Sequence, residues 1–244
     1  VEDTAYMLQA IAGHDPRDPT SSRAPVPDYS ASLKEDVAGL KIGVPRHFFF
    51  SDDPRIDGEV VSAVEVALKE LEGLGAEVRE VTVPMLDYAG AAQLVIMLGE
   101  AFAYHERNLL SRPQDFGEMC RGRFRSGALF TSADYIQAQR VRNVLKREFA
   151  QVLQGVDVIA SPTMSIQPPR FDESGPMTTP RTVSFTGPYN LTGMPAISVP
   201  CGFTSAGLPV GLQLAGKAFD EPTVLRAAYT YQQHARWFER RPPA

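Results

Sequence analysis

The side chains most able to do chemistry are few and lie far apart along the chain. There are two cysteines, Cys120 and Cys201, and four histidines. A catalytic cysteine needs a nearby cationic or basic group that stabilises its thiolate, and a zinc site needs ligands at short spacing. The histidines lack ligand spacing, and Cys201 follows a proline at a predicted strand end with no His or Lys near it in sequence. We therefore predict no metal, no cofactor and no catalytic role for Cys201.

The common catalytic motifs are absent from the sequence. It contains no Gly-x-Ser-x-Gly elbow, no phosphate-binding loop, no dinucleotide-binding glycine pattern and no Cys-x-x-Cys pair. The only adjacent serines, Ser21 and Ser22, lie in a segment rich in proline, aspartate and arginine, without flanking glycines, and are interpreted as turn residues. On these residues alone, the chain is an α/β domain without a recognisable reaction.

A strand–helix–strand unit is the clearest structural prediction. Apolar residues at helical spacing predict a helix over residues 57–74, with a strand before it at 40–44 and another after it at 78–83. Two strands joined by a helix in this way pair in parallel. The residues expected to face the core from the helix are Val60, Val64, Ala67, Leu68 and Leu71.

Further elements follow from the same kind of pattern. Helices are predicted near the N-terminus with Met7, Leu8 and Ile11 on one face, and at residues 89–110, 133–153 and 222–234. Residues 93–102 are the most apolar stretch and are predicted to be buried. Short strands are expected at 156–160, ending before Pro162, and at 196–199 and 210–214, with an irregular loop over 165–188.

Composition excludes several classes of protein. The formal net charge of −5, with 43% hydrophobic and 22% charged residues, fits a folded domain with a sizeable core and argues against disorder and direct binding of nucleic acid. No apolar run approaches the ~20 residues needed to cross a membrane. Two distant cysteines favour a reducing cytoplasm. The chain begins with Val1, so we expect its true N-terminus to be missing.

Three stretches resemble the amidase-signature family. They are Val-Glu-Asp-Thr-Ala at 1–5 with Ile-Ala-Gly-His-Asp-Pro-Arg-Asp-Pro at 11–19, Asp-Val-Ile-Ala-Ser-Pro-Thr at 157–163, and Asn-Leu-Thr-Gly-Met-Pro-Ala-Ile-Ser-Val-Pro-Cys-Gly-Phe at 190–203. The last continues as Gly-Leu-Pro-Val-Gly-Leu-Gln-Leu-Ala-Gly-Lys at 207–217. The family includes bacterial amidases and the A subunit of glutamyl-tRNA amidotransferase.

The resemblance implies a fold and a mechanism. The expected fold is α/β, a mixed, mostly parallel sheet flanked by helices. Family members hydrolyse amides with a Ser–cis-Ser–Lys triad. The triad residues precede the Val-Glu-Asp-Thr-Ala stretch, so residues 1–244 would be the C-terminal part of one amidase-signature domain, without its N-terminal catalytic half. No catalytic residue is therefore expected in this chain, which by itself should be inactive.

The resemblance also implies tentative substrate-binding residues. Arg123 would face the carboxylate of an amide donor, since a guanidinium binds a carboxylate bidentately; the alternative is three solvated arginines on a loop. Val183 stands where the amidotransferase proteins carry an acidic residue that binds the amino group of glutamine, which favours a general amidase with an apolar pocket. Phe185 and Thr186 would line the same pocket. The structural residues near the site would be Asn190, Gly193 and Pro195.

Three functions remain open on the sequence. The first is an amidase that hydrolyses the C–N bond of a small-molecule carboxylic amide. The second is the A subunit of a glutamyl-tRNA(Gln) or aspartyl-tRNA(Asn) amidotransferase, and the third is a non-catalytic binding or structural module. The expected partners are the amide substrate and the missing N-terminal half of the same protein, and the chain alone is expected to self-associate.

Overall fold

The computed structural model describes residues 1–34, 36–170 and 184–240. In these residues a single five-stranded sheet has the order β2-β1-β3-β5-β4. Its strands are β1 (Lys41–Val44), β2 (Glu77–Glu80), β3 (Val158–Pro162), β4 (Ala196–Phe203) and β5 (Pro209–Gly216). The helices are α1 (Glu2–Ile11), α2 (Arg46–Phe49), α3 (Gly58–Gly73), α4 (Ala89–Ser111), α5 (Glu118–Ser126), α6 (Ser132–Val152), α7 (Gly187–Thr192) and α8 (Glu221–Ala235).

Parallel and antiparallel pairings are equally represented in the sheet. Strand β1 is parallel to β2 and to β3, with Ile42 opposite Val78 and Val158. Strand β5 is antiparallel to both β3 and β4. The predicted parallel pair on either side of a helix is confirmed, and so is a mixed sheet flanked by helices. The hairpin formed by β4 and β5 supplies the antiparallel half.

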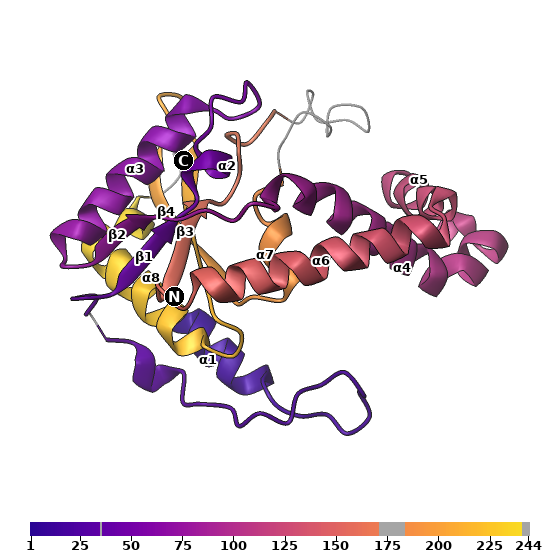
Figure 1. The fold of residues 1–244 in the computed structure, drawn as a ribbon, viewed down its shortest axis with the longest axis horizontal. Helices are drawn as coiled ribbons and strands as arrows, with labels where there is room; N and C mark the ends of the chain where they lie inside the picture. Colours follow the sequence, from indigo (N-terminus) through magenta and orange to yellow (C-terminus); the bar gives the residue numbers. More distant parts are fainter. Residues whose placement is uncertain (35, 171–183, 241–244) are drawn as a thin grey trace.

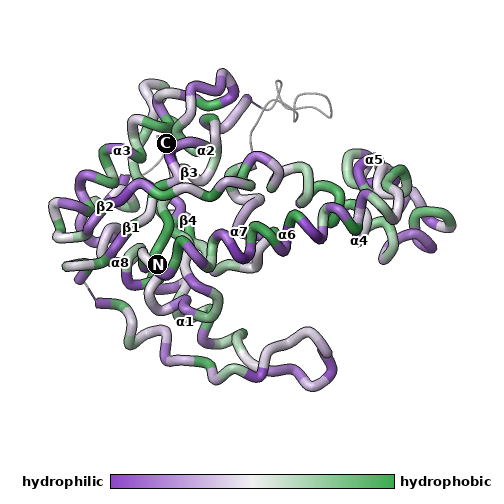
Figure 2. The backbone as a smooth tube through the Cα atoms, in the orientation of Figure 1, coloured by the Kyte–Doolittle hydropathy of each residue, from purple (hydrophilic) through white to green (hydrophobic). Residues whose placement is uncertain are grey.

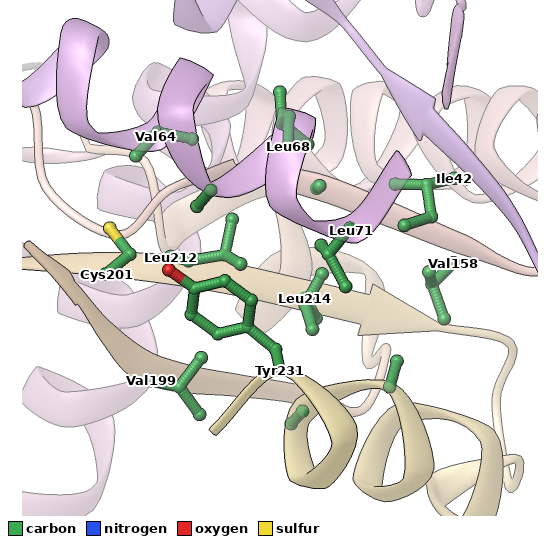
Figure 3. Close-up of a cluster of buried hydrophobic side chains, with 14 of the residues drawn as sticks. Ile42, Val64, Leu68, Leu71, Val158, Val199, Cys201, Leu212, Leu214 and Tyr231 are labelled. Atoms are coloured by element: carbon green, nitrogen blue, oxygen red, sulfur yellow. The ribbon is translucent and has the colours of Figure 1, made fainter. Parts of the chain in front are cut away.

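Helix α3 forms as its sequence predicts. The Asp57 side chain accepts a hydrogen bond from the Glu59 N–H and so caps the first turn. The five residues predicted to face the core are all buried. They pack with α8 against one face of the sheet, where Leu71, Leu212 and Leu214 lie near Tyr231 (Figure 3).

The opposite face of the sheet is covered by α4, α6 and α7. Ile159 and Ala215 belong to the hydrophobic cluster on this face, whereas their neighbours Val158 and Leu214 belong to the cluster under α3 and α8. This alternation follows from the two-residue period of strands. Helices α4 and α6 lie side by side and project beyond the sheet as an arm, with α5 at its outer end (Figure 1).

The exposure of two helices differs from what their apolar patterns suggest. In α1 the side chains of Met7 and Ile11 are 64% and 75% exposed, and of the predicted face only Leu8 packs, together with Ala5, on the rest of the protein. The stretch 93–102 is not a buried segment either, since Leu94 and Met97 are more than 40% exposed. Helix α4 has neighbours on one side only, because it is part of a projecting arm. Apolar residues accordingly occur along the arm as well as in the sheet (Figure 2).

Other boundaries differ from the predictions. Strand β2 ends at Glu80 rather than residue 83, because its partner β1 ends at Val44 and Pro45 turns the chain into α2. Pro162 lies within β3, opposite Leu212, rather than after the strand. The arginine-rich segment is the helix α5 and not a loop.

Candidate substrate-binding region

Helix α7 carries or adjoins most of the predicted site residues. Phe185 and Thr186 lie just before this six-residue helix, Asn190 lies within it, and Gly193 and Pro195 follow it. The helix starts very close to α4, because a Cβ atom on Gly187 would lie 2.4 Å from Oε1 of Gln93. Glycine at this position therefore allows the segment to sit against α4.

The end of α7 is a turn that glycine stabilises. Gly193 has a φ of +74°, in the left-handed region, where glycine has no steric penalty. The N–H groups of Gly193 and Met194 both donate to the Tyr189 carbonyl, at 2.9 and 3.1 Å. The Pro195 carbonyl then accepts from the Gly216 N–H at 3.0 Å, which ties the turn to the end of β5.

A buried polar network holds this segment on the sheet. The side-chain amide of Gln213, on β5, donates to Ser161 Oγ at 3.1 Å and to the Phe185 carbonyl at 3.2 Å. Ser161, on β3, lies 3.3 Å from the hydroxyl of Tyr189 on α7. All four residues are buried. A satisfied buried network of this kind fixes the relative positions of the elements that it joins.

The network is electrically neutral. Burial raises the pKa of Tyr189, and the hydrogen bond with Ser161 opposes this only in part. The phenol therefore stays protonated at physiological pH. Neither the amide nor the two hydroxyls of the network can act as a general base in this state. The arrangement carries no charge and positions α7 on the sheet.

Phe185 takes part in an aromatic cluster beneath α7. Its ring contacts Phe49 edge-on with 4.9 Å between centroids, and the Phe48 ring lies 5.9 Å from Phe185 and 4.9 Å from Phe49. The side chain of Phe185 is fully buried, whereas Thr186 is half-buried and Asn190 is exposed. In this arrangement Phe185 supports the segment from below. Of the tentative pocket residues in this segment, Thr186 is the one that reaches the surface.

Part of the sheet remains open next to this segment. Along β4 the residues Ile197, Val199 and Cys201 pack toward α3 and α8, while Ala196, Ser198 and Pro200 are exposed on the other face.

Two hydroxyls meet on this open face. Thr163 Oγ1 and Ser198 Oγ lie 2.6 Å apart, directly over Gly211, where a Cβ atom would come within 2.8 Å of each oxygen. The sheet thus presents a small polar surface that no described helix covers.

The structure does not bring Arg123 to α7. Arg123 is exposed on α5, at the outer end of the arm, whereas α7 lies at the arm's base (Figure 1). The neighbouring Arg121 and Arg125 donate to the carbonyls of Pro113 and Leu109. Among the described residues no hydrogen bond or ion pair engages the Arg123 guanidinium. Val183 lies outside the described residues, so the roles predicted for these two residues stay predictions.

Cys201 is a buried thiol between β4 and the α3–α8 layer (Figure 3). Burial, with a smaller effect from the carboxylate of Glu70, raises the pKa of Cys201 to about 12. The thiolate is therefore almost absent at neutral pH, which agrees with a structural role. Cys120 is exposed, and neither cysteine forms a disulfide.

Neither a metal site nor a membrane-spanning helix is visible in the described part of the chain. Within residues 1–34, 36–170 and 184–240, no three His, Cys, Asp or Glu side chains are grouped so that they could hold a metal ion. None of the helices in the same described ranges is both long and apolar enough to span a membrane.

Sequence reasoning missed the residues of the buried network. Ser161 and Gln213 interrupt two strands that are otherwise apolar, and Tyr189 lies in a short segment between proline and asparagine. A polar residue inside a fully buried strand needs a hydrogen-bond partner, which is the signal that could have singled out Ser161 and Gln213. The partners themselves are not readable, because they lie 28 and 52 residues apart in sequence.

Comparisons with known proteins agree along the whole chain. The family model described as Amidase matches residues 1–225. An amidase of Pseudomonas putida is 41% identical over 250 residues, which cover 99% of this chain and 53% of that protein. The A subunit of glutamyl-tRNA(Gln) amidotransferase from Brevibacillus brevis is 40% identical over 99% of this chain and 54% of its own length.

The solved structures show the same extent of similarity. The crystal structure of the A subunit of glutamyl-tRNA(Gln) amidotransferase from Thermotoga maritima superposes with a TM-score of 0.81 and 33% identity, over 97% of this chain and 51% of that one. The chain thus spans about half the length of the curated relatives that it matches.

Proposed function

Because the chain belongs to the amidase family, we propose that it forms the C-terminal part of an enzyme that hydrolyses the C–N bond of a carboxylic amide. The observation that carries this proposal is the continuous match over residues 1–225, which includes the described helices and strands up to α8. In the reaction, water adds across the amide, so that the C–N bond breaks and a carboxylic acid and an amine or ammonia leave.

In this proposal the chain provides a scaffold and a pocket wall. The mechanism implied by the resemblance uses a serine nucleophile, a second serine and a lysine, none of which this chain matches. The neutral network under α7 supports a positioning role, since it holds Thr186 and Asn190 at the surface without carrying charge. The isolated chain is accordingly proposed to be inactive.

The open part of the sheet is the proposed contact with the rest of the domain. Of the two edge strands, β2 is short and exposes Glu77, Arg79 and Glu80, which blunts that edge. Strand β4 is eight residues long and exposes small, uncharged side chains on one face. We therefore assign the β4 side, with the hydroxyl pair over Gly211, to the missing half of the domain.

An amidotransferase protein of the A type is the second candidate. The chain is 40% identical to the A subunit of a glutamyl-tRNA(Gln) amidotransferase and 41% identical to an amidase. Sequence identity therefore supports the amidotransferase type and the general amidase about equally. Val183 argues against it, because an apolar side chain cannot bind the ammonium group of glutamine. Placing an acidic side chain at position 183 is therefore the sharpest way to separate the two functions.

The decisive experiment uses the longer protein that contains this chain. It would be assayed with glutamine and with a panel of neutral and acidic carboxylic amides. A general amidase hydrolyses neutral amides, with glutamine a poor substrate, and Val183→Asp should raise the relative kcat/KM for glutamine. A protein that cleaves glutamine alone would instead be the amidotransferase type. Absence of turnover on every amide would contradict both.

Arg123 allows a narrower test of the pocket. If it contacts the substrate carboxylate, Arg123→Ala in the longer protein should lower kcat/KM for acidic amides by roughly tenfold or more, and leave neutral amides nearly unchanged. Arg140→Ala, which changes an exposed arginine on α6, is the matched control. An equal effect on both kinds of amide, or no effect on either, would mean that Arg123 does not contact the substrate carboxylate.

A further inference from the structure

A concave pocket lies where the end of α6 meets the turn after α7 and the loop after β5. Its volume is about 410 Å³, within the range of small-molecule sites. Its lining includes no residue of β4 and none of the network under α7. Its lining residues are Lys146, Phe149, Ala150, Leu153, Gln154, Thr192, Met194, Lys217 and Ala218.

The floor of this pocket is apolar. Phe149 and Leu153 are side chains of the hydrophobic cluster under α4, α6 and α7, and Met194 packs against the same cluster. The one hydroxyl in the described lining, that of Thr192, already donates to the Pro188 carbonyl at 2.7 Å. Because Phe149 and Leu153 are almost fully buried, a ligand meets hydrocarbon mainly at Met194, Ala150 and Ala218 above them, and gains from burying an apolar body there.

The rim of the pocket is positively charged. Lys146 and Lys217 are both exposed, they come from different elements, and no hydrogen bond or ion pair to another described residue engages either ammonium group. The described lining residues include no acidic side chain. Two uncompensated cations beside an apolar floor attract a ligand that carries negative charge at one end.

The helix ends next to the pocket do not cancel this charge. Both α6 and α7 present their C-terminal ends here, and such ends carry a partial negative charge of about half a unit each. The last carbonyls are already occupied, however. The Leu191 carbonyl accepts from Arg142 Nε at 2.7 Å, and those of Phe149 and Val152 accept from the backbone N–H groups that follow α6. The two lysines thus leave the rim with net positive charge.

We propose that this pocket binds a small amphipathic carboxylate, with its aromatic or aliphatic body over Met194, Ala150 and Ala218 and its carboxylate between Lys146 and Lys217. The proposal concerns this chain alone and does not depend on the proposed amidase activity. The ammonium groups of Lys146 and Lys217 supply the positive charge that a carboxylate needs, and the pocket volume fits a small apolar body attached to it.

The test is titration of the full chain with 4-phenylbutanoate and with its uncharged analogue 4-phenylbutan-1-ol, by calorimetry and by amide chemical shifts. The carboxylate should bind at least about fivefold more tightly than the alcohol, with the preference falling as salt is raised. The shifted amides should belong to the end of α6 and to residues 192–194 and 217–218. Equal affinity for the two compounds, or no saturable binding of the acid at millimolar concentration, would overturn the proposal.

Two substitutions with matched controls locate the site. Ala150→Glu places a carboxylate at an exposed lining position and should weaken 4-phenylbutanoate binding by roughly tenfold, while Gln151→Glu, at the next exposed residue on α6, should not. Lys217→Gln should remove most of the preference for acid over alcohol, whereas Lys69→Gln on α3 should preserve it. Because all four positions are exposed, folding is retained and a lack of effect would count against the site.

Discussion

At the scale of single residues, Gln213 joins two segments of the structure that no sequence motif links. Its amide reaches both Ser161 on β3 and the backbone just before α7. A buried amide in this position specifies how α7 sits on the sheet, because a shift in either element would leave buried polar groups without partners.

Gln213→Leu should therefore destabilise the chain. The substitution keeps the approximate volume but leaves Ser161 Oγ and the Phe185 carbonyl with fewer partners, at a cost of about 1–3 kcal/mol. Urea denaturation measures the change in the free energy of unfolding, and Gln151→Leu on the exposed face of α6 is the control. A loss no larger than that of the control would mean that the network does not fix α7.

Cys201 makes the stability of the chain depend on pH in the alkaline range. Its pKa is raised from the ordinary value of 9.0 to about 12 in the folded state, mainly by burial. Between these values the unfolded chain loses the thiol proton and the folded chain keeps it, so stability falls as pH rises from about 9 toward 12.

Cys201→Ala should flatten that part of the pH dependence. The measurement is the urea midpoint at pH 7.5, 9 and 10, compared with Cys120→Ala, which removes the exposed thiol. In the native wild-type chain only Cys120 should react quickly with a disulfide reagent at pH 8. Rapid reaction of two thiols before unfolding would show that Cys201 is accessible.

At the scale of elements, the turn after α7 is the most constrained piece of backbone in the candidate region. Gly193 holds a φ of +74° and its N–H bonds to the Tyr189 carbonyl, while no described atom lies within 4 Å of the position where a Cβ would stand. Conformation, and not lack of space, is therefore what favours glycine there.

Gly193→Ala should cost about 1 kcal/mol, because an L-residue is strained in the left-handed region, and Gly193→Asn should cost less. Gly58→Ala is the comparison, since Gly58 begins α3 with open space around it and without a positive φ. The midpoints of thermal unfolding of the three variants measure these differences in stability. If both alanine variants melted alike, the turn would not require the left-handed conformation.

Helix α4 illustrates a different constraint at this scale. It buries Ala92, Ile96 and Leu98 against its neighbours, yet Leu94 and Met97 remain exposed along its free side. Helix α4 thus buries apolar side chains only on the side that faces its neighbours. On its free side Leu94 and Met97 remain exposed, where a further packed helix would have buried them.

At the scale of the whole molecule, the sheet is asymmetric between its two ends. The charged, four-residue β2 protects one edge, whereas β4 exposes an uncharged strand and an uncovered face at the other. An uncovered edge strand pairs readily with another chain.

The isolated chain should consequently self-associate through β4. A stable contact would bury about 800 Å² per partner. Sedimentation equilibrium over a wide concentration range measures it, and Ala196→Lys, which adds charge to the exposed face of β4, should weaken the association while Arg79→Ala on β2 should not. A folded chain that stays monomeric at high concentration would show that β4 needs no partner.

The sequence by itself determined the local elements and the family. Helix α3 and its parallel strands are encoded by residues close in sequence, namely the Asp57 cap and the apolar stripe from Val60 to Leu71. The stretches at 1–19, 157–163 and 190–217 were enough to recognise the amidase family, because such motifs are contiguous. The same local information singled out Gly193 and Pro195 as structural residues.

The tertiary structure alone decided where side chains from distant segments meet. Ser161, Tyr189 and Gln213 form one network, and Lys146 and Lys217 flank one pocket, although each pair of partners is separated by many residues. It also showed which faces of α1 and α4 stay exposed, since periodicity marks an apolar face but not whether another element covers it. These properties depend on how layers pack across the chain, which local patterns do not encode.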